Sequence, residues 1–262
     1  MPGTTMADVS KVLGWQPGRL TQSLHGEASR MVALMSSMPY AVAGGPSRLG
    51  FMMEVASVAA GCALEQGMAM VLVPPLESGQ RSLDFMSVDG VLLIEPAAND
   101  KLLMDLTVRG LPVVSIGKPG GYGFNTVPYV DLRPGDSVQL LLEHLQAQGA
   151  RQIAMILGAA ERDSYAQAEV AYQHMAHAME MEHMVLRVDE ALGEAGGSDA
   201  ARKLLASYPQ IDALLVLVDV LAVGVMQHVH QVGLRVPHDI KIATRYDGMR
   251  ARTCEPALTA VN

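Results

Sequence analysis

Two apolar runs near the carboxyl end of the chain, each leading to an aspartate, constrain its fold more than any other feature. The first run ends at Asp219, and the second leads through Arg245 and Tyr246 to Asp247. Between them lies a helical pattern that stops at a glycine and a proline. Short apolar runs separated by a helix are typical of buried parallel strands. Because ligands bind beyond the carboxyl ends of such strands, we expect these four side chains at a ligand site.

The same alternation of strand-like and helix-like segments extends back to residue 30. Strands are expected at 31–35, 69–73, 88–94, 113–116, 128–131, 153–157, 185–188, 211–218 and 240–244. Helix-length segments between strands predict βαβ units and parallel sheets.

The rhythm of strands and helices restarts after the first five strands, which predicts two lobes in an α/β fold. We place a doubly wound parallel-sheet lobe at 30–130 and a second at 131–257, with an N-terminal remnant at 1–29. Residues 258–262 are expected to form a return strand toward the first lobe. A single large sheet is the alternative, and the usual size of sheets counts against it.

Composition excludes several classes of protein. Half of the 262 residues are hydrophobic, which is enough for a sizeable core. The two cysteines, Cys62 and Cys254, predict neither a disulfide framework nor a zinc site. We expect no signal peptide and no membrane contact, since no apolar run approaches the roughly 20 residues of a membrane span. A cytoplasmic protein is therefore expected.

The charge is unevenly distributed along the chain. The first thirty residues hold Lys11, Arg19 and Arg30 against Asp8 and Glu27, a net charge of +1, whereas the whole chain carries −8. Neutralisation of phosphates dominates affinity for nucleic acids, so the acidic main body is not expected to bind DNA. Any contact with DNA is expected to come from the N-terminal segment.

The motifs around the two aspartates resemble the effector-binding domain of the lactose-repressor (LacI/GalR) family of transcriptional regulators. In that family one strand ends in an Asn-Asp-like pair, a later strand ends in Gly-Phe/Tyr-Asp-Asp, and a Pro-x-Leu-Thr-x-Val segment follows. Here the corresponding residues read Val-Asp at 218–219, Arg-Tyr-Asp-Gly at 245–248 and Pro-Ala-Leu-Thr-Ala-Val at 256–261. The resemblance implies a periplasmic-binding-protein-like fold of type I, a sugar-like effector between the lobes and a homodimer.

The segment 13–35 resembles the hinge region of the same family. There a Leu-Gly-Tyr-x-Pro-Asn turn leads into a small helix and then the first core strand. The resemblance assigns contacts with DNA to Arg19 and Leu24, with Leu24 at the position of the leucine that wedges into the minor groove. The helix-turn-helix of the family would lie upstream, so we expect this chain to lack it and to be clipped at both ends.

The resemblance also adds Tyr165, Arg48 and Phe51 to the expected effector site. The chain departs from the family pattern at Ala168, where the family often has an arginine that binds the sugar. Arg162 or Arg245 is therefore a candidate to supply that positive charge.

Simpler interpretations compete with these site assignments. Asp219 and Asp247 could cap the segments that follow them. Arg245 could pair with Asp247 or with an anionic ligand, or lie on the surface. Phe51 could be a core residue, and the charges of Arg250 and Arg252 are expected to be solvated.

No pattern for catalysis, a metal or a cofactor is convincing. The glycine-rich segment 117–123 lacks the order of a phosphate-binding loop. His228 and His230 point to different faces of a helix, which suits no metal. We therefore expect a ligand-responsive regulator without a cofactor and not an enzyme. The alternatives are a stand-alone sensor or anti-repressor, and a small α/β enzyme that uses aspartate or tyrosine at the strand ends.

Overall fold

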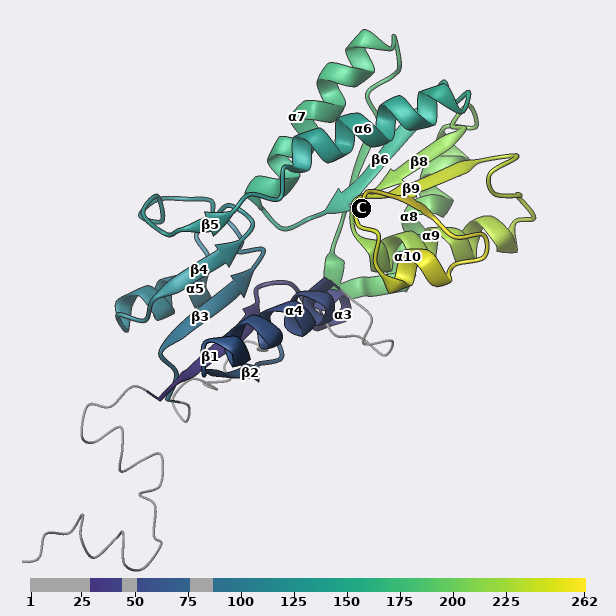
Figure 1. Ribbon diagram of the computed structural model, residues 1–262. Coiled ribbons are helices and arrows are strands. Elements are labelled where there is room, and N and C mark those ends of the chain that lie inside the picture. The colour runs from purple at the N-terminus through teal and green to yellow at the C-terminus, as the bar shows by residue number, and fades with distance from the viewer. Residues whose placement is uncertain (1–28, 44–50, 76–86) are drawn as a thin grey trace, which may run out of the picture.

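The computed structural model describes residues 29–43, 51–75 and 87–262, and these form two lobes (Figure 1). Each lobe is built on a sheet of five described strands, and every strand pairing is parallel. The predicted fold class, α/β with two doubly wound parallel-sheet lobes, is confirmed. The chain passes from the first sheet to the second lobe at 131–133.

The first sheet has the strand order β2-β1-β3-β4-β5. Its strands are β1 (Met31–Ser36), β2 (Ala69–Leu72), β3 (Gly90–Ile94), β4 (Val113–Ile116) and β5 (Tyr129–Val130). The described helices of this lobe are α3 (Tyr40–Ala43), α4 (Phe51–Glu65) and α5 (Lys101–Val108).

Both faces of the first sheet are covered, which explains why its strands read as continuous apolar runs. In β1, Ala33 and Met35 belong to the cluster that includes Leu103 of α5, while the intervening Leu34 packs with Met52 of α4. Successive side chains of a strand point to opposite faces. A strand that is covered by a helix on each face therefore carries apolar side chains on both faces.

The second sheet has the strand order β10-β9-β8-β6-β7. Its strands are β6 (Ile153–Gly158), β7 (Val185–Val188), β8 (Ala213–Val216), β9 (Lys241–Thr244) and β10 (Thr259–Ala260). Its helices are α6 (Pro134–Ala147), α7 (Asp163–Ala178), α8 (Gly193–Ser207), α9 (Asp219–Gln231), α10 (Met249–Thr253) and the short 3₁₀ helix η2 (Glu190–Leu192).

Helices α6 and α7 cover one face of the second sheet, and α8 and α9 cover the other (Figure 1). Helices α8 and α9 approach each other through Gly197 and Gly224. A Cβ atom at Gly197 would lie 2.0 Å from the carbonyl oxygen of Leu221, and one at Gly224 would lie 1.8 Å from that of Glu194. Only glycine permits this packing distance between the two backbones.

The expected return strand corresponds to β10. β10 pairs with β9 at the edge of the second sheet, where Ala260 is in register with Thr244, and residues 258–262 do not reach the first sheet. A strand that follows β9 closely along the chain can pair with it directly, and this pairing satisfies backbone groups that would otherwise be open at the edge.

Part of the predicted structure lies outside the described residues. This holds for residues 1–28 of the N-terminal remnant, with Arg19 and Leu24, and for Arg48 of the expected effector site. The described helix α4 begins at Phe51. Across the described ranges, no helix is both long and apolar enough to cross a membrane.

Candidate functional site

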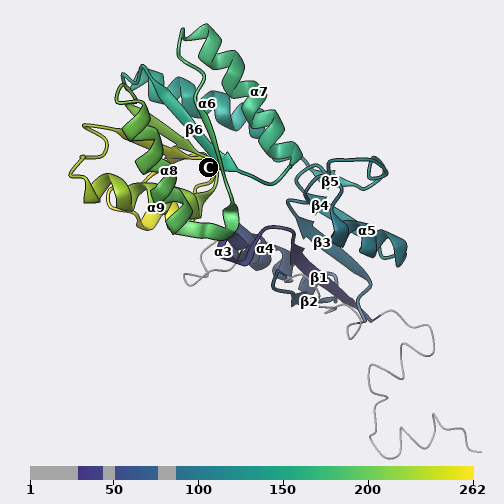
Figure 2. The same cartoon turned by 180° about the vertical axis from the view of Figure 1, so that it is seen from behind.

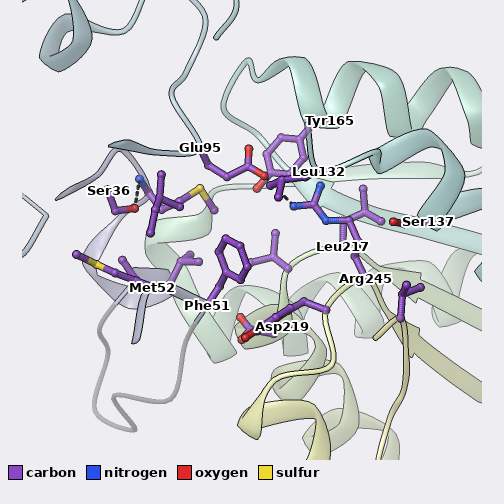
Figure 3. A pocket seen from close by; sticks show the side chains of 17 residues that line it. Ser36, Phe51, Met52, Glu95, Leu132, Ser137, Tyr165, Leu217, Asp219 and Arg245 are labelled. Atoms are coloured by element: carbon purple, nitrogen blue, oxygen red, sulfur yellow. Dashed lines mark hydrogen bonds and ion pairs between the residues drawn. The ribbon is translucent and has the colours of Figure 1, made fainter. Parts of the chain in front are cut away.

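A cavity of about 220 Å³ lies between the two lobes and is lined by residues of both (Figure 3). The lining from the first lobe is Ser36, Met38, Val42, Ala43, Phe51, Met52, Ile94 and Glu95. The lining from the crossover and the second lobe is Leu132, Ser137, Tyr165, Leu217, Val218, Asp219, Arg245, Tyr246 and Val261. The cavity therefore lies where the carboxyl ends of β1, β3, β8 and β9 face one another, as expected for parallel sheets.

Glu95 is the charged residue that the first lobe contributes to the cavity lining, and it follows the end of β3. Its Oε1 accepts a hydrogen bond of 2.8 Å from Nη2 of Arg245, and its Oε2 accepts one of 2.7 Å from Oγ of Ser164. Both donors belong to the second lobe, so one carboxylate joins the two lobes at the pocket wall. The Arg245 and Glu95 side chains point toward each other across the cavity (Figure 3).

A second buried acid lies behind the wall of the cavity. Glu190 accepts a hydrogen bond of 3.2 Å from the hydroxyl of Tyr165, and Nε of Arg162 lies 3.6 Å from its carboxylate. Arg162 in turn donates through its two Nη groups to the carbonyl oxygens of Glu95 and Ser37 in the first lobe. Burial, with the adjacent Glu190 carboxylate adding to it, raises the pKa of Tyr165, which therefore stays a neutral hydroxyl.

Gly158 makes room for this cluster at the end of β6. A Cβ atom there would lie 2.5 Å from both the Glu190 carboxylate and the Tyr165 ring. A larger residue at position 158 would therefore displace the Glu190 carboxylate or the Tyr165 ring.

Asp219, the first residue of α9, lines the cavity and also accepts a hydrogen bond from a main-chain amide of the helix. Its Oδ1 accepts a hydrogen bond of 2.7 Å from the amide of Val220, and its two oxygens lie 3.0 and 3.2 Å from Nη1 of Arg250. Burial raises the pKa of Asp219, and the charge of Arg250 opposes this. Asp219 is not the cap of the helix, because Val218 holds the N-cap position and makes no side-chain capping bond. The expectation that Arg250 is solvated is wrong, because α10 folds back onto α9 and buries it.

Asp247 does not line the cavity. Its carboxylate accepts two hydrogen bonds of 3.0 Å from Arg252 on α10, and Arg252 lowers the pKa of Asp247 despite the opposing effect of desolvation. The turn after β9 directs Arg245 and Tyr246 to the cavity and turns the next side chain away from it. The pairing of Arg245 with Asp247 that the sequence left open is replaced by the pairing of Arg245 with Glu95.

Two aromatic side chains from different lobes meet at the cavity. The rings of Phe51 and Tyr246 lie edge to face, with centroids 4.8 Å apart. Such an arrangement is the favoured one for aromatic pairs. Burial, to which the neighbouring Glu54 carboxylate adds, raises the pKa of Tyr246. Both rings line the cavity, so Phe51 is a pocket residue as well as a packed one.

Sequence reasoning did not select Glu95, Ser164 or Arg250. Glu95 follows the apolar run of β3, so the rule that selected Asp219 would also have selected it. Ser164 and Arg250 carry no such signal, because their roles depend on the contact between lobes and on the fold of α10.

The charges around the cavity form three buried or half-buried acid–base pairs, and these suit hydrogen bonding to a polar ligand. Arg245 keeps one buried nitrogen, Nη1, without a hydrogen-bond partner at the cavity. Within the described ranges there is no group of three or more His, Cys, Asp or Glu side chains placed to hold a metal ion.

Comparison with known proteins agrees with this architecture. Residues 142–262 match the family model of a periplasmic binding protein-like domain. The transcriptional regulator CelR of Thermobifida fusca is 29% identical over 265 residues, which cover 96% of this chain and 75% of that protein. The ribose operon repressor of Halalkalibacterium halodurans is 26% identical over 261 residues, which cover 96% of this chain and 73% of the repressor.

Solved structures show the same fold. The structure of CelR in complex with cellobiose superposes with a TM-score of 0.75 at 24% identity and covers 100% of this chain and 80% of that one. A LacI-type regulator from Bacillus cereus subsp. cytotoxis gives a TM-score of 0.75 at 20% identity, covering 88% and 83%. This fold and these sequence relatives support an effector-binding domain of a transcriptional regulator of the LacI/GalR family.

Proposed function

We propose that this chain binds a small, polar, sugar-like effector in the cavity between its lobes and so controls a regulator of transcription. The observation that carries the proposal is the cavity itself, which both lobes line and which combines aromatic rings with buried hydrogen-bonding groups. Sugar sites need such a combination, because rings cover apolar faces and fixed polar groups select hydroxyls. The solved relative CelR is described as a complex with cellobiose, which supports this class of ligand.

The residues proposed to contact the effector are those of the earlier prediction that line the cavity. Phe51, Tyr165 and Tyr246 supply rings and hydroxyls, and Asp219 and Arg245 supply an acceptor and a donor. Asp247 is not included, because it faces Arg252.

The effector acts by changing the relative position of the lobes. A ligand shifts such an equilibrium only through its different affinities for the two arrangements. In the whole regulator, this movement would order or release hinge segments on DNA, with Arg19 and Leu24 as the proposed contacts. A homodimer formed through the first lobe is part of the proposal, and helix α4 is its suggested contact surface.

A thermal-shift screen of sugars, polyols and nucleosides, beginning with cellobiose and ribose, tests the proposal. A compound at about 100 times its Kd stabilises the folded state by roughly 2.7 kcal/mol. For a chain of this size, that amounts to a rise in Tm of roughly 5 °C or more. A complete screen without any stabilising compound would contradict the proposal.

Titration calorimetry of the best compound then locates the site. We expect Phe51→Ala to weaken binding by at least about tenfold, which corresponds to the roughly 1.4 kcal/mol that an aromatic contact can supply. Met53→Ala is the matched control, since Met53 is exposed on the same helix and does not line the cavity. Equal affinities for both variants would place the ligand elsewhere.

A further inference from the structure

Helix α3 of the first lobe packs into the second lobe beside the cavity. Val42 belongs to the hydrophobic core of the second lobe, although it follows β1 in the chain. Ala41 lies next to Gly193, where an added Cβ atom would be 3.5 Å from the Ala41 side chain. Figures 1 and 2 show α3 against the end of the second lobe that carries α9. Because α3 belongs to the first lobe and packs on the second, a change in its position changes the relative position of the two lobes.

Arg250 links α3 to Asp219, which lines the cavity. Nη1 of Arg250 donates to the carboxylate of Asp219 at 3.0 and 3.2 Å and to the carbonyl oxygen of Val42 at 3.0 Å. Nη2 of the same guanidinium lies 3.4 Å from the carbonyl oxygen of Ala41. The planar guanidinium has donors in a fixed fork, so it can serve an acid and two main-chain carbonyls only in one orientation.

The acid that orients this arginine also lines the cavity. The side chains of Arg250 and Asp219 are only 4% and 6% exposed, so bulk water has little access to either partner. A ligand hydroxyl that donates to Asp219 shares the oxygens that hold Arg250. Where charges are buried, the strength of such a pair is sensitive to a change at either partner.

We propose that Arg250 is a positioning residue that couples occupancy of the cavity at Asp219 to the placement of α3, and so of the first lobe. The inference rests on the proposed function, because it assigns to the ligand the oxygens that orient Arg250. It makes the Asp219–Arg250 pair the link between effector and lobe position. Arg250 itself does not line the cavity.

The chain offers a matched control on the same helix. Arg252 forms an acid–arginine pair with Asp247 at 3.0 Å, two residues beyond Arg250. That pair is within the second lobe, and the side chains are 52% and 25% exposed. Removing Arg252 changes the charge of α10 as much as removing Arg250 does. Arg252 interacts with the first lobe through the charge of Glu54, whereas Arg250 donates hydrogen bonds to the main chain of α3.

The test measures the distance between lobes in the unliganded protein by pulsed electron paramagnetic resonance. Spin labels are placed through Val108→Cys on α5 and Gln146→Cys on α6, both exposed, in a background with Cys62→Ser and Cys254→Ser. Dilution with unlabelled chain restricts the signal to pairs within one molecule. Into this background are introduced Arg250→Met, Asp219→Asn, the double variant, and the control variants Arg252→Met and Asp247→Asn.

We expect Arg250→Met and Asp219→Asn each to lengthen and broaden the distance distribution, and the double variant to go no further than either. The two control variants should match the background. Melting followed by circular dichroism verifies folding, and Arg250→Lys replaces Arg250→Met if the latter does not fold. Lysine keeps the charge but cannot serve all three acceptors, so it too should lengthen the distance.

Three results would overturn the proposal. One is an unchanged distance in Asp219→Asn when Arg250→Met lengthens it, since Arg250 would then hold α3 independently of the cavity. Another is an additive effect in the double variant, and the third is no change in any variant. Because no ligand is used, failure here is separate from failure of the proposed function, which the titrations reveal.

Discussion

At the scale of single residues, Glu95 joins the lobes at the cavity. Its carboxylate is shared between Arg245 and Ser164, and its carbonyl oxygen accepts from Arg162. All of these donors come from the second lobe. A buried acid with several partners is costly to lose, because each partner is left without its acceptor in a place where water has little access.

Glu95→Gln is therefore expected to lower the free energy of unfolding by about 3 kcal/mol, near the low end for breaking a buried ion pair because Arg245 keeps some exposure. Urea unfolding followed by circular dichroism measures this. Asp199→Asn, which removes a surface acid beside Arg202 and Lys203, is the control and should leave the midpoint unchanged. Equal effects of the two substitutions would show that Glu95 does not stabilise the lobe contact.

Asp89 makes the start of β1 sensitive to acid. Its carboxylate accepts hydrogen bonds from the amide and hydroxyl of Ser29 at 2.9 Å and from the amide of Met31 at 3.2 Å. Although desolvation acts in the opposite direction, these bonds lower the pKa of Asp89 below its usual 3.8. The stability it contributes is therefore complete above pH 3.8 and is lost as the pH falls through the lower pKa of the folded state.

We expect Asp89→Asn to destabilise the protein at pH 7, and the difference from the parent chain to shrink as the pH falls below about 3.8. Unfolding free energies measured from pH 7 to acid conditions provide the check. A difference that stays constant with pH would mean that the charge of Asp89 is not what holds Ser29 and Met31.

At the scale of elements, the pairing of α8 with α9 shows how glycines set a packing distance. The backbones of the two helices approach at Gly197 and Gly224, and each glycine lies against a carbonyl of the other helix. Asp219 begins α9, so the same packing fixes one wall of the cavity. A shift of α9 would therefore reach the candidate site directly.

Gly197→Ala and Gly224→Ala should each lower the free energy of unfolding by roughly 1–3 kcal/mol or more, the range for overpacking a tight interior. Gly61→Ala in α4 is the matched control, since nothing lies within 4 Å of a Cβ atom there. In a helix interior alanine is favoured over glycine by about 1 kcal/mol, so the control should be neutral or stabilising. Differential scanning calorimetry compares the three, and equal melting temperatures would refute the close-approach argument.

At the scale of the whole molecule, helix α4 has large apolar side chains that the described structure leaves exposed. Val58 is 70% exposed and Leu64 is 77% exposed, and Cys62 lies exposed on the same helix. A helix that is apolar on most of its circumference is expected to be buried on more than one side. A second copy of the chain is the partner that the proposed function supplies for this surface.

Val58→Lys together with Leu64→Lys should convert a dimer to a monomer in sedimentation at roughly tens of micromolar, where ordinary interfaces are populated. Val108→Lys on α5 is the control, because Val108 is 82% exposed on another helix of the first lobe. We also expect the Cys62 thiol to react with a maleimide faster in the double variant than in the parent chain. A parent chain that sediments as a monomer would exclude α4 as the dimer contact.

The sequence by itself determined the fold class and predicted part of the candidate site. Buried parallel strands must be apolar on both faces, so their positions are visible in the sequence, and polar residues at their carboxyl ends mark Asp219, Arg245 and Tyr246 without further information. What only the tertiary structure decided is how these residues are paired. Asp247 turns toward Arg252, and Arg245 reaches Glu95, which lies 150 residues away in the chain. Local spacing carries no information on such contacts, because they arise when two separately wound sheets close on one another and bury charges that must then find partners.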